Sequence, residues 1–402
     1  MIKKLNSDSY ALLLLCSDIA LLGKEVKPFT LKQWDDFSKK LLDQGLRPAV
    51  FLDKDTELWE SRLKMTHIEI ERVKKLISRA AQLGLELERL SRLGIWVTTR
   101  AETNFPQRYK KILRNQSPVF IYGSGDLELL NEGGTAIVGS RDVDEQGINF
   151  TKKLAERLAI EGEVVISGGS RGVDRIAEMG AMSQGGRVVS VLSDSMERVI
   201  LQKEIRNRIL QKQLLVISAY HPSSRFRGYT ALERNKHIYG LSNYAIVVAA
   251  ATQKSGTWSG ASENLKNAWV PLFVRESSIP LVGNESLLKL GGISFTEDIF
   301  EQEKSIINWL YDKSKNPLIN MNTFETHEKV DLFQIVWPHI EKLLHKERSL
   351  QELSQILCTI PDQMRIWMET AVKLNRVNRS SKGFKIAKKT IDSEPLEQLN
   401  LF

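Results

Sequence analysis

A series of short apolar segments rich in β-branched residues constrains the fold of this 402-residue chain more than any other feature. These segments alternate with helical patterns and lie at residues 119–122, 135–138, 164–167, 188–192, 214–218, 245–249 and 270–274. Several of them lack polar alternation, so both faces of each strand are expected to be buried, as in a parallel sheet covered by helices. The pattern therefore predicts an α/β fold with a doubly wound parallel sheet.

Helical patterns flank this region on both sides. Before it, Thr30 can cap a helix over residues 31–46, and apolar residues recur at helical spacing over 68–93, with a break expected at Gly84. We expect a helical N-terminal domain over 1–94, the α/β domain over 95–294, a connector over 295–330, a winged-helix domain over 331–390 and a tail over 391–402.

Charge and cysteine content exclude some classes of protein. Lys plus Arg number 57 and Asp plus Glu number 49, giving a net charge of +8, which permits nucleic-acid binding without demonstrating it. Two cysteines exclude a disulfide framework and a cysteine-rich zinc site, and the six histidines lack metal-binding spacing. We therefore expect neither a metal site nor a cofactor.

The N-terminal sequence is not that of a signal peptide. Lys3 and Lys4 precede an apolar stretch over residues 11–15, but Asp18 interrupts it and no small-residue cleavage site follows. No apolar run approaches the roughly 20 residues of a membrane-spanning helix. These features predict a cytoplasmic protein without membrane contact, which also suits two unpaired cysteines.

The first glycine-rich turn follows the apolar segment 135–138. Gly139 lets the backbone turn tightly and approach a ligand. Ser140 can donate a hydrogen bond to a phosphate, and Arg141 can bind one with two N–H groups. The helix expected over 146–160 directs the positive end of its dipole to the same place. This turn is therefore a candidate phosphate site.

The second glycine-rich turn follows the apolar segment 164–167 and precedes a helix expected over 175–182. Its backbone N–H groups can form an anion-binding nest, and an arginine adds positive charge. The residues concerned are Ser167, Gly168, Gly169, Arg171 and Gly172. Asp174 stands at the start of the helix, where it is either an N-cap or a ligand-binding or catalytic group.

The third element combines basic and aromatic residues. Arg225 and Arg227 alternate with Phe226 and Tyr229, and this mixture suits single-stranded nucleic acid, because bases stack on aromatic rings while arginines bind phosphates. The alternative is a solvated loop with two core aromatics. The segment leads to a polar run ahead of the next strand, consisting of Arg234, Asn235 and Lys236.

The fourth element follows the apolar segment 245–249 and opens another helix. A phosphate can bind the residues Lys254, Ser255, Gly256 and Thr257. Trp258 can stack on a base or pack in the core, and Glu263 lies in the first turns of the helix. Ligands bind at the carboxyl ends of the strands in open α/β sheets. Three glycine-rich turns on strand ends of one sheet therefore predict a phosphate-binding cleft.

The ordered set of motifs resembles the DNA-processing protein A (DprA/Smf) family. The resemblance rests on residues 138–141, 167–174, 234–236 with 240–242, and 254–256, and it extends over about 95–294. It implies an extended Rossmann-like fold that binds single-stranded DNA and helps to load a recombinase during DNA uptake. It also implies that Ser140, Arg141, Arg171 and Asn235 line the DNA-binding face.

One loop departs from the family pattern. Residues 256–263 are similar to the loop of phosphoribohydrolases of the same wider superfamily, in which a Gly-Thr turn is followed by a glutamate. Those enzymes cleave an N-glycosidic bond, and their glutamate follows the threonine by three residues, whereas Glu263 follows Thr257 by six. A carboxylate can stabilise the oxocarbenium-like transition state of such a reaction.

The C-terminal domain is expected to contribute DNA contacts. Three helices, the second capped by Ser349 and the third opened by Pro361, precede a hairpin with alternating basic and apolar residues. The basic residues of this hairpin are candidates for contact with the DNA backbone: Arg376, Arg379 and Lys382. A winged helix that binds protein instead is the alternative.

Two functions follow from these observations. The first is a DNA glycosylase-like hydrolase with Glu263 and Asp174 as catalytic residues, acting on a nucleotide flipped out of the duplex, in repair or antiviral defence. The second is a non-catalytic protein that binds single-stranded DNA and loads a recombinase. Of these two functions, we expect the first, the hydrolase. DNA is the expected partner in both cases, with a recombinase and a second copy of the chain as further partners.

Overall fold

The structure, a computed structural model, describes residues 5–19, 26–277, 280–302, 304–315, 332–357, 359–374, 376–380 and 383–386. The chain forms two compact units, Met1–Phe324 and Glu325–Phe402, and each is considered by itself below. The predicted boundaries at residues 94 and 294 both fall inside the first unit, and the five-part domain division stays a prediction. The predicted tail over 391–402 lies outside the described residues.

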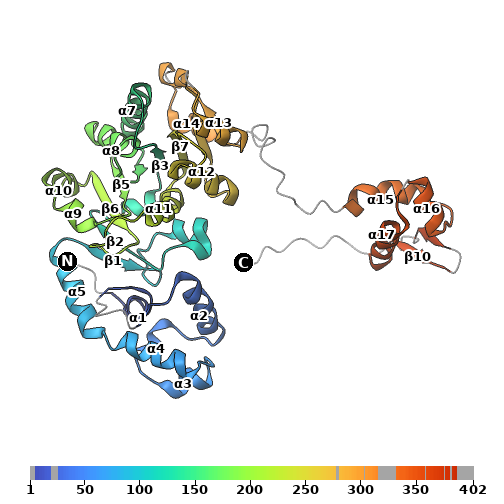
Figure 1. Cartoon of the computed structure of the whole chain (residues 1–402), viewed down its shortest axis with the longest axis horizontal. Coiled ribbons are helices and arrows are strands. Elements are labelled where there is room, and N and C mark those ends of the chain that lie inside the picture. Colours follow the sequence, from blue (N-terminus) through green and yellow to red (C-terminus); the bar gives the residue numbers. More distant parts are fainter. Residues whose placement is uncertain are drawn as a thin grey trace. The chain divides into compact units, whose positions relative to one another are not determined.

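A nine-stranded sheet forms the centre of the first unit in its described part (Figure 1). The strands are β1 (Trp96–Thr99), β2 (Phe120–Ser124), β3 (Thr135–Gly139), β4 (Val165–Ser167), β5 (Val188–Val191), β6 (Leu214–Ser218), β7 (Tyr244–Ala249), β8 (Leu272–Arg275) and β9 (Ile293–Phe295). Their spatial order is β1-β2-β6-β5-β4-β3-β7-β8-β9. The pairs from β6 to β9 are parallel, which confirms the predicted doubly wound α/β fold.

One edge of the sheet differs from the prediction of an all-parallel arrangement. β1 and β2 form an antiparallel pair, and β2 also runs antiparallel to β6. β1 and the three-residue β9 were not predicted. β1 ends in two threonines and β9 has a serine at its centre, so neither segment stands out as a continuous apolar run.

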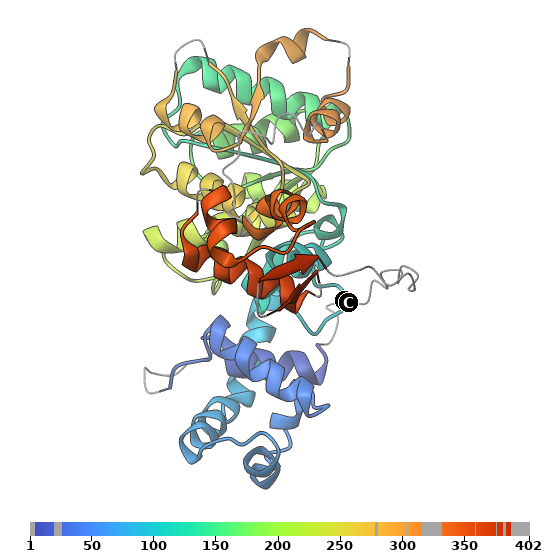
Figure 2. The same cartoon turned by 90° about the vertical axis from the view of Figure 1, so that its right-hand side faces the viewer.

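Helices cover both faces of the sheet (Figure 2). They are α6 (Leu129–Glu132), α7 (Glu145–Ile160), α8 (Val173–Ser183), α9 (Met196–Ile200), α10 (Lys203–Leu210), α11 (Gly228–Leu241), α12 (Gly256–Asn267), α13 (Val282–Lys289) and α14 (Ile306–Ser314). Successive residues of one strand enter different cores: Ile137 packs with α7 and α8, whereas Ala136 and Val138 pack with α11 and α12. Burial on both faces explains why the strands are continuously apolar.

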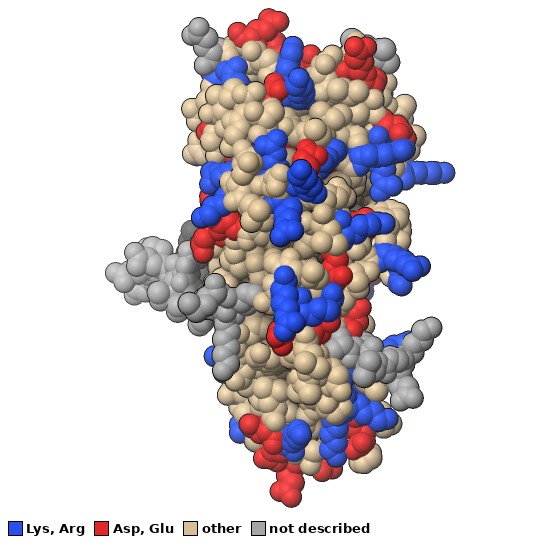
Figure 3. Space-filling view, turned by 90° about the vertical axis from the view of Figure 1, so that its left-hand side faces the viewer, with Lys and Arg blue, Asp and Glu red and all other residues tan. Residues whose placement is uncertain are grey.

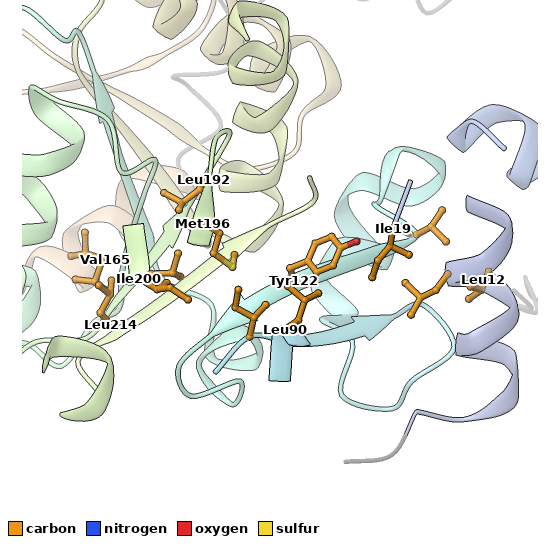
Figure 4. Close-up of a cluster of buried hydrophobic side chains, with 14 of the residues drawn as sticks. Leu12, Ile19, Leu90, Tyr122, Val165, Leu192, Met196, Ile200 and Leu214 are labelled. Carbon is orange, nitrogen blue, oxygen red and sulfur yellow. The ribbon is translucent and has the colours of Figure 1, made fainter. Parts of the chain in front are cut away.

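The N-terminal helices continue the core on one face of the sheet. They are α1 (Ser7–Cys16), α2 (Leu31–Asp43), α3 (Thr56–Ser61), α4 (His67–Ile77) and α5 (Ala80–Arg92). Figure 4 shows buried side chains running from Leu12 and Ile19 through Leu90 of α5 and Tyr122 of β2 to the strands. The Oγ atoms of Ser9 in α1 and Thr99 in β1 lie 2.8 Å apart. The predicted helical region therefore shares a core with the sheet.

The break in the helical pattern over 68–93 lies at a buried arginine and not at the predicted glycine. α4 ends at Ile77 and α5 begins at Ala80, so Gly84 lies inside α5. Between the two helices, the Arg79 guanidinium donates to the carbonyl oxygens of Leu76 and Ile19 over 3.0 and 2.8 Å, and also to that of Leu14. These bonds satisfy the buried cation at the break.

The second unit contains the elements expected for its segment. α15 (Leu332–Leu343), α16 (Leu350–Ile356) and α17 (Pro361–Lys373) precede an antiparallel hairpin of β10 (Val377–Arg379) and β11 (Phe384–Ile386). Ser349 caps α16 in a capping box with Glu352, and Pro361 opens α17, as predicted. The order of elements is that of the predicted winged helix, and the winged-helix assignment itself stays a prediction. Among the described helices of the chain, none is long and apolar enough to cross a membrane.

We expect the contact of α5 with the sheet core to stabilise the first unit. Leu90 is fully buried in this core, so Leu90→Ala should lower the free energy of unfolding by about 2–5 kcal/mol through the cavity that it creates. Leu85→Ala is the matched control, because Leu85 lies on the same helix and is 70% exposed; its effect should stay within about 0.5 kcal/mol. Urea unfolding measures both, and equal losses would contradict a shared core.

Candidate nucleic-acid interface

One cavity of the predicted site opens where the chain leaves β3 and β7. These strands are neighbours, yet β3 leads through α7 to β4, whereas β7 leads through α12 to β8 on the opposite side. Such a change of direction leaves a crevice at the carboxyl ends of the strands. A cavity of about 480 Å³ lies there, lined by Ser140 and Arg141 after β3 and by Gly256 and Thr257 after β7. We call it the switch-point cavity.

Two glycines allow the turns around this cavity to approach each other closely. A Cβ on Gly139 would lie 2.5 Å from Val173 Cγ2, where α8 begins. Gly172 has φ +81°, and a Cβ there would lie 2.4 Å from the Ser140 carbonyl oxygen. Only glycine fits such a position without strain. These glycines therefore bring the first and second predicted turns into contact.

The ends of two helices direct amide groups toward the switch-point cavity. Ser255 caps α12 by accepting a hydrogen bond from the Trp258 N–H over 3.2 Å, and Gly256 and Thr257 form the first turn at the cavity wall. Gly228, the first residue of α11, lies on another part of the wall. Unpaired N–H groups and the positive end of the helix dipole make such termini favourable for an anion.

Arg141 and Phe226 form the exposed rim between this cavity and a second one. The Arg141 guanidinium carbon lies 5.1 Å from the centre of the Phe226 ring, within the range of a cation–π contact. Both residues line the switch-point cavity and an adjoining cavity of about 320 Å³, which Gly168, Gly169 and Arg171 also line. Phe226 is 46% exposed, so its ring can stack on a base.

A buried arginine and a buried aspartate lie beneath the second turn. The Arg234 guanidinium donates to the Val191 carbonyl oxygen over 2.6 Å, and its Nε–H has no partner among the described residues. Burial raises the pKa of Asp174 and lowers that of Arg234, while each charge favours the ionised form of the other. A Cβ on Gly168 would collide with both side chains. Both residues line the switch-point cavity.

A buried glutamate accepts a hydrogen bond from one backbone amide of the predicted anion nest. Glu178 of α8 is 2% exposed, and its Oε1 accepts a hydrogen bond from the Gly169 N–H over 2.9 Å. Burial raises the pKa of Glu178 to about 7, against hydrogen bonds from Ser190 and Gly169 that favour the carboxylate. The Gly169 amide is thus committed to a protein carboxylate, and Glu178 positions the turn from below. No sequence motif distinguishes Glu178 from other helical glutamates.

The structure brings many of the predicted site residues together at the two cavities. The switch-point cavity is lined by Gly139, Ser140, Arg141, Asp174, Arg234, Asn235, Ser255, Gly256 and Thr257, and the adjoining cavity by Arg141, Gly168, Gly169 and Arg171. Ser170, Phe226 and Tyr239 also line them and were not predicted as site residues. Ser170 stands within the second motif and Phe226 within the basic-aromatic segment, so both carried a usable signal.

Other predicted residues lie outside these two cavities. The Ser167 hydroxyl donates to the Ile137 carbonyl oxygen over 2.7 Å, and the Trp258 indole donates to Ser286 over 3.3 Å, so both have partners within the fold. Lys236 and Lys254 do not line either cavity, and Gly172 packs between turns. Arg225 and Arg227 line a third cavity, described below.

The helix-cap interpretation of Asp174 is wrong. α8 begins at Val173 with Gly172 as its N-cap, two residues earlier than predicted, so Asp174 lies inside the first turn. Glu263 lies in α12 between buried Ala261 and Asn264. It is absent from the linings of the switch-point cavity, the adjoining cavity and the cavity that Arg225 and Arg227 line. Among the described residues, no group of three or more His, Cys, Asp or Glu can hold a metal ion.

In the second unit, the predicted basic residues have different environments. The Arg376 guanidinium carbon lies 5.7 Å from the Phe333 ring centre and 5.3 Å from that of Trp337, so this side chain packs on the core of the unit. Arg379 is exposed, with its guanidinium carbon 5.8 Å from the Phe384 ring centre. Lys382 lies outside the described residues.

The buried Glu178 should make stability depend on pH. Its pKa in the folded protein is about 7, above the ordinary 4.5, so between these values the unfolded chain releases a proton that the folded chain keeps. Stability should therefore fall as pH rises from about 4.5 to about 7. Glu178→Gln keeps an acceptor for the Gly169 N–H but cannot titrate, so its fall should be smaller by on the order of 3 kcal/mol. Urea unfolding at several pH values measures this, and identical pH profiles would contradict it.

Comparison with known proteins identifies relatives of similar sequence. The chain is 32% identical over 145 residues to the DNA processing protein DprA of Streptococcus pneumoniae, and this alignment covers 35% of this chain and 50% of that protein. It is 28% identical over 206 residues to Protein Smf of Escherichia coli, and this alignment covers 50% of this chain and 54% of that protein. The matches thus span about half the length of these two curated relatives.

A solved structure of a DNA processing protein A is also similar to this chain. The structure of DNA processing protein A from Helicobacter pylori, described for its single-stranded DNA binding mode, aligns with 26% sequence identity and a TM-score of 0.44. The alignment covers 55% of this chain and 96% of that one.

The family model overturns the expected enzyme. Residues 96–295 match the model of the DNA recombination-mediator protein A family, which is a family of mediators and not of hydrolases. The expectation of an N-glycosidic hydrolase with Glu263 and Asp174 as catalytic residues is therefore wrong, and repair of a base or antiviral defence has no support. The position of Glu263 outside the cavities agrees with this correction. The chain belongs to the DNA-processing protein A (DprA/Smf) family.

Proposed function

We propose that this protein binds single-stranded DNA at the switch-point cavity and acts as a non-catalytic mediator of DNA recombination. The observation that carries the proposal is the cavity of about 480 Å³, because helix N-termini and the exposed Arg141 meet there at the carboxyl ends of the strands. The family supplies the recombination role, and the H. pylori relative binds single-stranded DNA.

The cavity has the chemistry that a DNA backbone needs. Arg141 forms no salt bridge with a described acidic residue, so its charge is available to a phosphate, whereas exposed Arg171 pairs with Asp142 over 2.9 Å. Asn235 donates to the Gly256 carbonyl oxygen over 3.1 Å, which fixes the start of α12 beside α11. The phosphate therefore meets donors that are already in position, which lowers the cost of ordering them on binding.

The exposed Phe226 ring favours single-stranded over double-stranded DNA. A ring of this kind binds the face of a base, and base faces are accessible only where the strand is unpaired. On the face of the molecule drawn in Figure 3, Lys and Arg side chains are spread among Asp and Glu side chains. The charge on that face does not by itself define a track for DNA, so the cavity carries the specificity in this proposal.

The remaining expectations fit this proposal as additions to it. Exposed Arg379 in the second unit is available for a further backbone contact, whereas the core packing of Arg376 limits its reach. A recombinase is the partner that a mediator would serve, in the cytoplasm, and a second copy of the chain is a further expected partner.

Arg141→Ala should test the proposal directly. Loss of one charged hydrogen-bond donor should weaken binding of an oligodeoxythymidylate by about tenfold or more, and the log–log salt slope should become shallower by about one unit. Fluorescence anisotropy at several salt concentrations measures both.

Arg92→Ala is the control for that measurement. Arg92 is also exposed, at 77%, and lies on α5 in an ion pair with Glu88. Its loss should leave affinity and slope unchanged. A folded Arg141→Ala protein with wild-type affinity and slope would remove the switch-point cavity from the proposed function.

A further inference from the structure

A short segment separates the switch-point cavity from a third cavity of the first unit. Phe226 lines the switch-point cavity, whereas its neighbours Arg225 and Arg227 line a cavity of about 330 Å³. Arg227 has extended backbone angles, φ −138° and ψ 138°, and successive side chains of extended backbone point in opposite directions. The segment 225–229 is thus a wall with one aromatic ring on one side and two arginines with Tyr229 on the other.

We propose that this third cavity is a second subsite for the same DNA strand, which takes the base of a further nucleotide while Arg225 and Arg227 bind the flanking phosphates. The proposal rests on the proposed function, because it extends the path of the strand beyond the switch-point cavity. We call this cavity the tyrosine pocket.

The lining of the tyrosine pocket suits a base. Its rings come from β2, from the segment after β6 and from the first turn of α11: Phe120, Tyr220, His221 and Tyr229. Tyr229 is 57% exposed, and its hydroxyl oxygen accepts a hydrogen bond from Arg227 Nη1 over 2.9 Å, which holds the phenol beside a cation. A base stacked on such a ring contributes about 1–3 kcal/mol, with little dependence on sequence.

The charges in the pocket separate base from phosphate. Asp18, from the N-terminal region, also lines the pocket. A carboxylate repels a phosphate but accepts hydrogen bonds from the amino groups of bases. Arg225 and Arg227 are exposed, so they can reach phosphates outside the pocket. The arrangement therefore places the base inside and the backbone along the exposed arginines.

The pocket is held in shape before any ligand binds. The Tyr220 hydroxyl donates to the Thr230 carbonyl oxygen over 3.1 Å, and the Thr230 hydroxyl donates to the Arg227 carbonyl oxygen over 2.7 Å. The ring centres of His221 and Tyr122 lie 6.0 Å apart in an edge-on contact. These contacts fix both ends of the segment, so that less conformational entropy is lost when a nucleotide binds.

Oligonucleotide length separates the two subsites. We would measure binding of fluorescein-labelled oligodeoxycytidylates of about 3 and about 12 nucleotides to the full chain by anisotropy, because the inference requires the longer strand to occupy both cavities and the shorter strand to occupy one. Tyr229→Leu should weaken binding of the 12-mer by about tenfold, the scale of one lost stack, and leave the 3-mer unchanged. The Arg225→Gln, Arg227→Gln double variant should make the salt slope shallower by about two units for the 12-mer only.

Two controls keep the result specific. Tyr229→Phe keeps the stacking ring and should bind the 12-mer within about twofold of wild type. Tyr311→Leu removes another tyrosine, 47% exposed on α14, and should change nothing.

The outcomes distinguish this inference from the proposed function. Equal 12-mer affinity for wild type and Tyr229→Leu, with Arg141→Ala still defective, would overturn the tyrosine pocket and leave the switch-point cavity intact. A wild-type protein that binds neither oligonucleotide would overturn both.

Discussion

The parallel pairing of β3 with β7 is the constraint on which the candidate interface depends. The pairing joins Thr135–Val138 to Tyr244–Val247, segments that are far apart in the sequence. Because the chain leaves the two strands toward opposite sides of the sheet, their loops cannot close over each other. The N-terminus of α12 and the turn after β3 therefore face a common space, and Arg141 meets Gly256 and Thr257 there.

Three buried ionisable side chains hold the second turn beside this space, and their burial costs desolvation free energy. Asp174, Glu178 and Arg234 are each at least nine-tenths buried, although burial disfavours the charged form of all three. Such a cluster of buried charges adds little to stability, because the free energy of desolvation can exceed the attraction between the charges. What it provides is position: the Gly169 amide and the Val191 carbonyl each have a fixed partner. We infer that the turn is held rigid so that Arg141 and Phe226 can present their groups to the strand.

Sequence reasoning predicted the centre of the fold well and its edges less well. The predicted strands are present because their apolar runs are buried on both faces, and the glycines marked the turns that must approach closely. β1 and β9 were missed because Thr98, Thr99 and Ser294 interrupt their apolar residues, so that neither forms a continuous apolar run. The break at Arg79 was missed because it depends on carbonyl groups distant in sequence, those of Leu14 and Ile19.

The wrong prediction of an enzyme shows where local sequence reasoning fails for a site. Glu263 follows a Gly-Thr turn, and a loop-based argument places it near the strand ends, but the turn already belongs to α12. Six residues beyond Thr257 correspond to more than one helical turn and about 9 Å of rise along the axis. The carboxylate is thereby carried away from the cavity that Thr257 lines. Whether a residue near a glycine-rich turn reaches the ligand thus depends on where the helix begins, which the motif alone does not specify.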